Sequence, residues 1–144
     1  MSSAQMSSNR EELMKGLNHA LNREVSTFLR YMLSAAKIKG IVNAPVRELY
    51  SAEVADELGH ATYLADKIVM LGGTPELNPD LTPPADEVTE MLKYDIAQEK
   101  IDVEGYLKLA ELADREGLAE LKVRMEEQAA DEAHHAEVME RLLG

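Results

Sequence analysis

The chain has 144 residues and a formal net charge of −12; hydrophobic residues make up 45% of it and aromatic residues only 4%. This length fits one domain, and a core built from aliphatic side chains and methionine favours helices over sheets. The acidic balance argues against a nucleic-acid or anionic-membrane partner. Because the sequence contains no cysteine, disulfides, zinc–thiolate sites and cysteine-ligated iron–sulfur clusters are excluded.

The N-terminal segment is polar and lacks the apolar run of a signal peptide. No apolar stretch reaches the roughly 20 residues of a membrane span, so we expect no membrane contact and a cytoplasmic location. Residues 1–8 are predicted to be a disordered tail, and residues 9–144 a single domain. Ser8 stands three residues before Glu11, which predicts the capping box of a first helix.

Four segments then carry apolar residues at helical spacing and predict helices of roughly 25–30 residues, or about 40 Å each. Gly40 ends the first segment, and Asn43 with Pro45 predicts the cap and first turn of the second. The pair Gly72-Gly73 terminates the second. The apolar residues at this spacing run from Leu13 to Ala35, from Val46 to Leu71, from Val88 to Ala110 and from Leu118 to Leu142, and Arg115-Glu116-Gly117 forms a short break before the last segment.

A long irregular segment, residues 74–86, separates the second and third predicted helices and contains four prolines. It is too long for a tight turn between antiparallel neighbours, but it can run the length of a bundle and join two parallel helices. The connection between the first and second predicted helices is short, and so is the connection between the third and fourth. The sequence therefore predicts an all-α four-helix bundle with one long crossover between helices 2 and 3.

Acidic residues interrupt the apolar face of two of these helices. Glu24 lies between Leu21 and Phe28 on the first helix, where the spacing calls for an apolar residue, and Glu99 interrupts the third helix in the same way. Both carboxylates are therefore predicted to point into the bundle.

The other two helices each carry a Glu and a His three residues apart, which places the two side chains on one face. Glu57 follows Glu24 by 33 residues, and Glu132 follows Glu99 by the same 33. Shifting the first half by 75 residues also superposes other polar positions. The matched pairs include Tyr31 with Tyr106, Asp56 with Asp131, His60 with His135, and Glu53 with Gln128.

Four carboxylates inside a bundle are costly, because each unpaired buried ion costs several kcal/mol and a domain is stable by only about 5–15 kcal/mol. Two divalent cations would neutralise four carboxylates, and carboxylate with imidazole suits iron, manganese or zinc. The same constellation is the general pattern of di-iron and di-manganese bundles. The predicted ligands are Glu24, Glu57, His60, Glu99, Glu132 and His135. The alternative is a solvated pair of surface charges.

The residues beside these ligands allow more than one interpretation. Asp56 and Asp131 either accept a hydrogen bond from a metal-bound histidine or are exposed helix acids. Tyr31 and Tyr106 hydrogen-bond a ligand carboxylate, supply an electron or simply pack in the core. Glu53 is interpreted as a solvated acid in preference to an entry path for iron.

Two further histidines are interpreted as surface residues, His19 and His134. His134 competes with His135 as the ligand, since Asp131 lies three residues before it. We expect His135 to be the ligand because it keeps both the repeat and the apolar face.

The sequence resembles bacterioferritin, in order along nearly the whole chain from about Glu11. The resemblance is carried by Asn22-Arg23-Glu24, by Asp56-Glu57-Leu58-Gly59-His60-Ala61, by Glu90-Met91-Leu92 through Asp95 to Glu99, and by Asp131-Glu132-Ala133-His134-His135. It implies a ferritin-like bundle and a di-iron ferroxidase, in which two Fe(II) ions are oxidised by O2 or H2O2 for iron detoxification or storage. It also implies that Glu57 and Glu132 bridge the ions, that Glu24 and Glu99 cap one each, and that His60 and His135 bind one each.

Two departures from bacterioferritin bear on its other properties. That family binds haem through a methionine one residue after the second-helix Glu; here the position is Leu58, so no haem is expected. The family also continues into a short fifth helix that helps to close a 24-subunit shell, whereas this sequence ends at Gly144. We expect a homodimer, with a 24-subunit shell as the alternative. The apolar residues expected at the dimer interface are Tyr50, Met70, Phe28 and Met32.

Three other functions remain open on the sequence. A peroxide reductase like rubrerythrin adds a carboxylate one turn after the third-helix ligand, where this chain has the shorter Asp102. A dimanganese catalase-like site would use the same ligands. A non-enzymatic bundle that buffers metal would need no redox turnover.

Overall fold

The computed structural model describes residues 7–144 and contains four helices in this range, with no strand. The predicted all-α four-helix bundle is confirmed. Residues 1–6 of the predicted tail lie outside the described residues. The cap is Ser7, whose Oγ accepts the Arg10 N–H at 3.0 Å, so the helix begins at Ser8 itself. The helices are α1 (Ser8–Lys37), α2 (Ala44–Met70), α3 (Val88–Arg115) and α4 (Ala119–Leu143).

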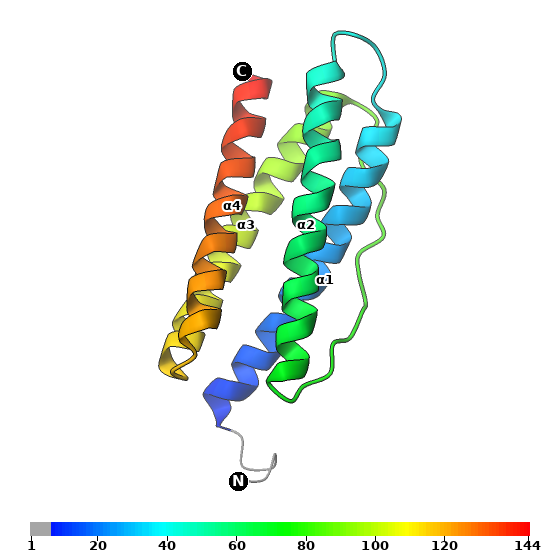
Figure 1. The fold of residues 1–144 in the computed structure, drawn as a ribbon. Helices are drawn as coiled ribbons and strands as arrows, with labels where there is room; N and C mark the ends of the chain where they lie inside the picture. The colour runs from blue at the N-terminus through cyan, green and yellow to red at the C-terminus, as the bar shows by residue number, and fades with distance from the viewer. Residues whose placement is uncertain (1–6) are drawn as a thin grey trace.

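The helices form two antiparallel pairs, α1 with α2 and α3 with α4 (Figure 1). The crossover that connects α2 to α3 runs the length of the bundle along α1. This makes α2 and α3 parallel, as the length of the crossover predicted. Gly72 and Gly117 adopt φ values of 89° and 71° at the ends of α2 and α3. Only glycine takes up this left-handed geometry at little cost, so these residues stop both helices where the sequence indicated.

Polar side chains of α1 hold the crossover against the bundle. Asn22 donates to the carbonyl of Glu76 at 2.8 Å and accepts the backbone N–H of Asn78. One turn earlier, Asn18 binds both Thr74 and Glu76, and one turn later Ser26 accepts the N–H of Asp80 at 2.8 Å. Because these three residues are spaced four apart, they line one stripe of α1 and bond successive residues of an extended chain.

Two apolar clusters fill the bundle, one towards each end. The first includes Leu13, Leu64, Leu109 and Leu121, and the second includes Tyr31, Val46, Leu92 and Met139. On every helix the predicted ligands lie between the segments that build these two clusters. The clusters therefore fix the four helices above and below a polar layer at mid-height.

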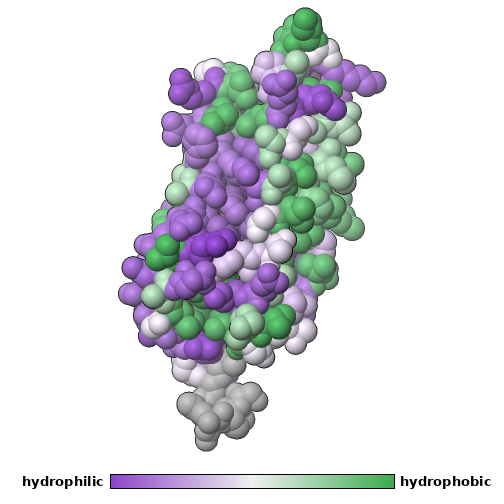
Figure 2. All heavy atoms as spheres, in the orientation of Figure 1, coloured by the Kyte–Doolittle hydropathy of each residue, from purple (hydrophilic) through white to green (hydrophobic). Residues whose placement is uncertain are grey.

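The surface carries several exposed apolar residues. Met70 is 78% exposed and Met32 45% exposed, whereas Tyr50 is fully buried. Its assignment to a dimer interface is therefore wrong, because its hydroxyl binds Asp95 inside the bundle. In Figure 2 polar residues dominate the strip between α4 and α2, and apolar residues gather on the side of α1 and the crossover. None of the helices described here has a run of apolar residues long enough to cross a bilayer.

Replacing Asn22 with alanine is expected to lower the free energy of unfolding by about 1–2 kcal/mol, because two hydrogen bonds to the crossover are lost. The crossover should also become more sensitive to limited proteolysis. Asn43→Ala is the matched control, since the Asn43 side chain makes no capping bond and its loss should change stability by less than about 0.5 kcal/mol. Equal urea midpoints for the two variants would contradict the role of Asn22.

Candidate metal centre

The structure brings all six predicted ligands together at the middle of the bundle. Glu24 comes from α1, Glu99 from α3, and a Glu–His pair from each of α2 and α4. Every one of these side chains is buried; His60, at 7%, is the most exposed. The four carboxylates therefore do lie inside the protein, as their positions on the apolar faces predicted.

The ligand atoms fall into two groups in which all atoms lie within 4.8 Å of one another. One group contains Glu24, His60, Glu57 and Glu132, and the other contains Glu99, His135 and the same two glutamates. Each group offers three carboxylates and one imidazole. Because Glu57 and Glu132 belong to both groups, the arrangement is that of two adjacent cation positions with two shared carboxylates.

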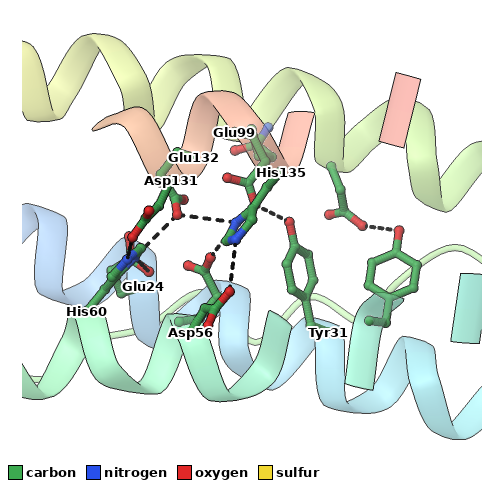
Figure 3. A network of polar contacts seen from close by, with 12 residues as sticks. Glu24, Tyr31, Asp56, His60, Glu99, Asp131, Glu132 and His135 are labelled. Atoms are coloured by element: carbon green, nitrogen blue, oxygen red, sulfur yellow. Dashed lines mark hydrogen bonds and ion pairs between the residues drawn. The ribbon is translucent and has the colours of Figure 1, made fainter. Parts of the chain in front are cut away.

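Both histidine rings direct Nδ1 into the centre and Nε2 out of it (Figure 3). His60 Nδ1 lies 3.3 Å from Glu132, and its Nε2 lies 2.9 Å from Asp131 on α4. His135 mirrors it, with Nδ1 at 3.2 Å from Glu57 and Nε2 at 3.2 Å from Asp56 on α2. An Nε2–H donated to an aspartate leaves Nδ1 with a free lone pair, which is the tautomer that binds a cation.

The two tyrosines of the repeat bind the two unshared glutamates, also across the halves. Tyr31 on α1 donates its hydroxyl to Glu99 on α3, and Tyr106 on α3 donates to Glu24 on α1. Each half of the chain thus supplies the hydrogen-bond partners for the other half. The two tyrosines fix one oxygen of each terminal carboxylate and leave the second oxygen without a hydrogen bond in the protein.

The remaining atoms of the centre have no partner in the protein. Glu24 Oε2, Glu99 Oε2 and both Nδ1 atoms are buried without a hydrogen bond, as are both carboxylate oxygens of Glu57 and Glu132. Such groups are rare in proteins because each unmade bond costs about 1–3 kcal/mol or more. They belong to the six residues whose ligand atoms converge in the two groups, so the donor set fits a pair of divalent cations.

Without a metal, burial and the neighbouring charges shift the pKa values of several residues in the centre. Burial, reinforced by Glu24, raises the pKa of Glu57 well above its usual range, and burial likewise raises the pKa of Glu132. Burial acts to lower the pKa of His60, but the facing carboxylates, Glu24 first, outweigh it and raise the pKa to about 9. Without a cation, the centre therefore takes up protons to reduce its negative charge.

A further buried acid near the centre was not identified from the sequence. Asp95 accepts hydrogen bonds from Arg30 Nε at 2.7 Å and from the Tyr50 hydroxyl at 2.6 Å. The ring of Tyr50 packs edge-on against Tyr31, with centroids 5.0 Å apart, and so supports the tyrosine that holds Glu99. The spacing of Leu92, Asp95 and Glu99 along one face of α3 was the available signal.

Two other polar positions are buried against expectation. Glu53, interpreted as a solvated acid, is only 3% exposed, and burial raises its pKa to about 8. Its repeat partner Gln128 is buried as well, with neither amide atom hydrogen-bonded. Both lie one turn before a shared glutamate, on the face that points into the bundle. The surface interpretation of Glu53 is therefore wrong.

Asp102 is also buried, and Arg23 of α1 forms an ion pair with it. Burial nevertheless raises the pKa of Asp102 to about 7. It belongs to neither group of converging ligand atoms. His134 and His19 are exposed, and His135, not His134, lies in the centre.

Comparison with known proteins identifies the class to which this fold and centre belong. Residues 14–144 match the family model of the ferritin-like domain, and the chain belongs to that family. It is 29% identical over 89 residues to a bacterial ferritin of Pseudomonas aeruginosa. That match spans 62% of this chain and 58% of the relative.

Solved structures agree with this assignment. A ferritin-like, diiron-carboxylate protein from Bacillus anthracis is 40% identical, with a TM-score of 0.91 over 96% of this chain and 100% of the other. Desulfovibrio desulfuricans bacterioferritin shares the fold at 20% identity, with a TM-score of 0.84 over 94% of this chain and 80% of its own.

The buried position of Glu53 generates a prediction for the metal-free protein. Its pKa rises from 4.5 to about 8 on folding, so the folded state binds the extra proton more tightly than the unfolded state does. This contribution to stability is present below pH 4.5 and is lost as the pH rises through about 8. Replacing Glu53 with glutamine should therefore reduce the loss of stability over this range.

Urea unfolding in a chelator at several pH values would measure this difference. Glu104→Gln, an exposed acid on α3, is the control and should leave the pH dependence unchanged. Parallel curves for wild type and Glu53→Gln would contradict the assignment.

Proposed function

We propose that this protein is a di-iron ferroxidase that oxidises Fe(II) with O2 or H2O2 in iron detoxification or storage. The observation that supports it best is the pair of ligand groups that share Glu57 and Glu132. Two Fe(II) ions oxidised together give two electrons, which with two protons reduce one O2 to H2O2, or one H2O2 to two water molecules. Two adjacent metal positions match this stoichiometry.

Each ligand has a distinct role in this proposal. Glu57 and Glu132 belong to both ligand groups and would be shared by the two ions, and the remaining residues would bind one ion each: Glu24 with His60, and Glu99 with His135. Asp131 and Asp56 hold the imidazole tautomers, and Tyr106 and Tyr31 orient the terminal carboxylates. Four carboxylates with two neutral imidazoles balance the four charges of two divalent ions.

The relatives support iron as the metal. The Bacillus anthracis protein, 40% identical over nearly the whole chain, is described as a diiron-carboxylate protein, and the Pseudomonas aeruginosa relative is a bacterial ferritin. Manganese and zinc have the same preference for carboxylate and imidazole and are expected to bind as substitutes.

The structure disfavours a peroxide reductase of the rubrerythrin kind. The carboxylate that such an enzyme adds one turn after the third-helix ligand would be Asp102 here. Asp102 is bound by Arg23 and stays outside the two ligand groups. A dimanganese catalase-like centre and a metal buffer without turnover use the same six ligands. Oxygen consumption by the Fe(II)-loaded protein, measured below, separates a ferroxidase from a metal buffer.

The proposal includes assembly into a homo-oligomer. Solved relatives include a dodecameric thioferritin from Bacteroides fragilis, 23% identical with a TM-score of 0.82 over 92% of this chain and 84% of the other. Exposed Met32 and Met70, with part-buried Phe28, remain candidates for an interface on α1 and α2. Leu58 is half exposed on α2 and offers no sulfur ligand, so we expect an interface without haem.

Replacing Glu24 or Glu99 with alanine is expected to abolish rapid Fe(II) oxidation, because each removes the terminal carboxylate of one ion. Circular dichroism should show unchanged helix content. The metal-free variants should be at least as stable as the wild type, since a buried charge is lost. Glu104→Ala serves as the control. Oxidation at the wild-type rate by both Glu24→Ala and Glu99→Ala would exclude the proposed centre.

Metal binding is expected to stabilise the folded protein, because the convergent ligands exist only in the folded state. At a free metal concentration of about 100 times Kd the gain should be about 2.7 kcal/mol. Calorimetry of chelated and Fe(II)-, Mn(II)- or Zn(II)-loaded protein measures this difference. Melting that does not depend on metal would refute the metal centre, whereas stabilisation without oxygen consumption would indicate a metal buffer.

A further inference from the structure

An apolar hollow of about 200 Å³ lies between α1 and α3, on a side of the bundle that supplies none of the His–Asp pairs. Its walls include Gly16 and Ala20 from α1 and Ile101, Gly105 and Leu109 from α3. Charged residues such as Glu12 and Lys108 also line it. The small residues Ala20 and Gly105 leave the gap between the two helices open, whereas the side chain of Leu109 packs against Gly16.

Gly105 shows this most clearly. It lies inside α3, it does not have the positive φ that would require glycine, and a Cβ added there would meet nothing within 4 Å. Glycine inside a helix is less favourable than alanine because it has more backbone freedom to lose. Neither backbone conformation nor packing accounts for glycine here, so what its absent side chain provides is open space.

The hollow ends at a residue of the metal centre. Tyr106 lines it, and the hydroxyl of the same side chain donates to Glu24 inside the centre. Tyr106 is only 2% exposed, so this residue is enclosed in the bundle between the hollow that it lines and Glu24. One side chain thus lies between an apolar surface recess and the proposed cation positions.

The opposite face of the bundle has a different chemistry. A hollow of about 270 Å³ between α2 and α4 is lined by His60, Asp56, Asp131 and Glu127, among others. Its acids suit a cation that approaches the centre. The two openings therefore differ in polarity, one apolar and one acidic.

We propose that the hollow between α1 and α3 is the entry site for dioxygen, while Fe(II) enters on the acidic α2–α4 face. This inference rests on the proposed ferroxidase function and specifies how its two substrates reach the same centre. O2 is small, uncharged and apolar, so it partitions into an apolar recess and gains nothing from the acidic one. H2O2 keeps its hydrogen bonds to water and is expected to follow the polar face.

The proposal is tested with the substitution Gly105→Leu, whose side chain fills the hollow. The substitution places a side chain in open space and improves helix propensity, so the variant is expected to fold. At limiting O2, its rate of Fe(II) oxidation should fall several-fold, while oxidation by H2O2 and the binding of two metal ions remain at wild-type values. Gly105→Ala, which fills less of the hollow, should show a smaller effect.

Gly59→Leu is the matched control. Gly59 is also an internal helix glycine whose added Cβ meets nothing within 4 Å, but it lines the acidic hollow. Because it narrows the polar face, this variant should lower the H2O2-driven rate at least as much as the O2-driven rate, and should therefore show no O2-selective defect. An equal fall of both rates in Gly105→Leu, or the same O2-selective defect in Gly59→Leu, would overturn the proposal.

A second readout does not depend on iron. Crystals of metal-free protein under xenon pressure should show a xenon atom beside Gly105 in the wild type and none in Gly105→Leu, because apolar recesses bind this gas. Absence of xenon from the wild-type hollow would contradict an apolar gas site. If xenon binds but neither oxidant oxidises Fe(II), the ferroxidase function fails while the gas site remains.

Discussion

Burial of four carboxylates in the middle of the bundle is the constraint on which the rest of the structure depends. Glu24, Glu57, Glu99 and Glu132 have almost no contact with solvent, and six of their eight oxygens lack a hydrogen bond in the protein. Burying even one unpaired ion costs several kcal/mol. The two apolar clusters that flank the layer offset this cost in the metal-free protein, and a pair of divalent cations would remove most of it.

The halves of the chain are connected through this layer by exchanged partners. His60 and His135 each find their aspartate on the other half, and Tyr31 and Tyr106 each bind a glutamate of the other half. An altered position of one helix therefore disturbs ligands on two helices. This interdependence keeps the ligand atoms within a few ångströms of one another across four separate helices, and it gives the centre its near-twofold symmetry.

The symmetry is incomplete in the residues around the centre. Glu53 carries a carboxyl group where its repeat partner Gln128 has an uncharged amide, and Asp95 with Arg30 and Tyr50 has no counterpart in the other half. The faces differ as well, since the α1–α3 hollow is apolar and the α2–α4 hollow is acidic. The proposed reaction between a cation and a dissolved gas would give a physical reason for two unlike approaches to one symmetric centre.

The four helices, the crossover and the six converging residues could be predicted from the sequence alone. Caps, glycines and prolines act locally, and a repeated spacing of Glu and His needs no knowledge of the fold. The sequence did not reveal that Glu53 and Tyr50 are buried. Nor did it reveal the pairing of Arg30 with Asp95, because these two residues are 65 positions apart in the chain. Helical periodicity tells which residues share a face, but which helix covers that face, and with which polar partners, is decided only when the four helices pack.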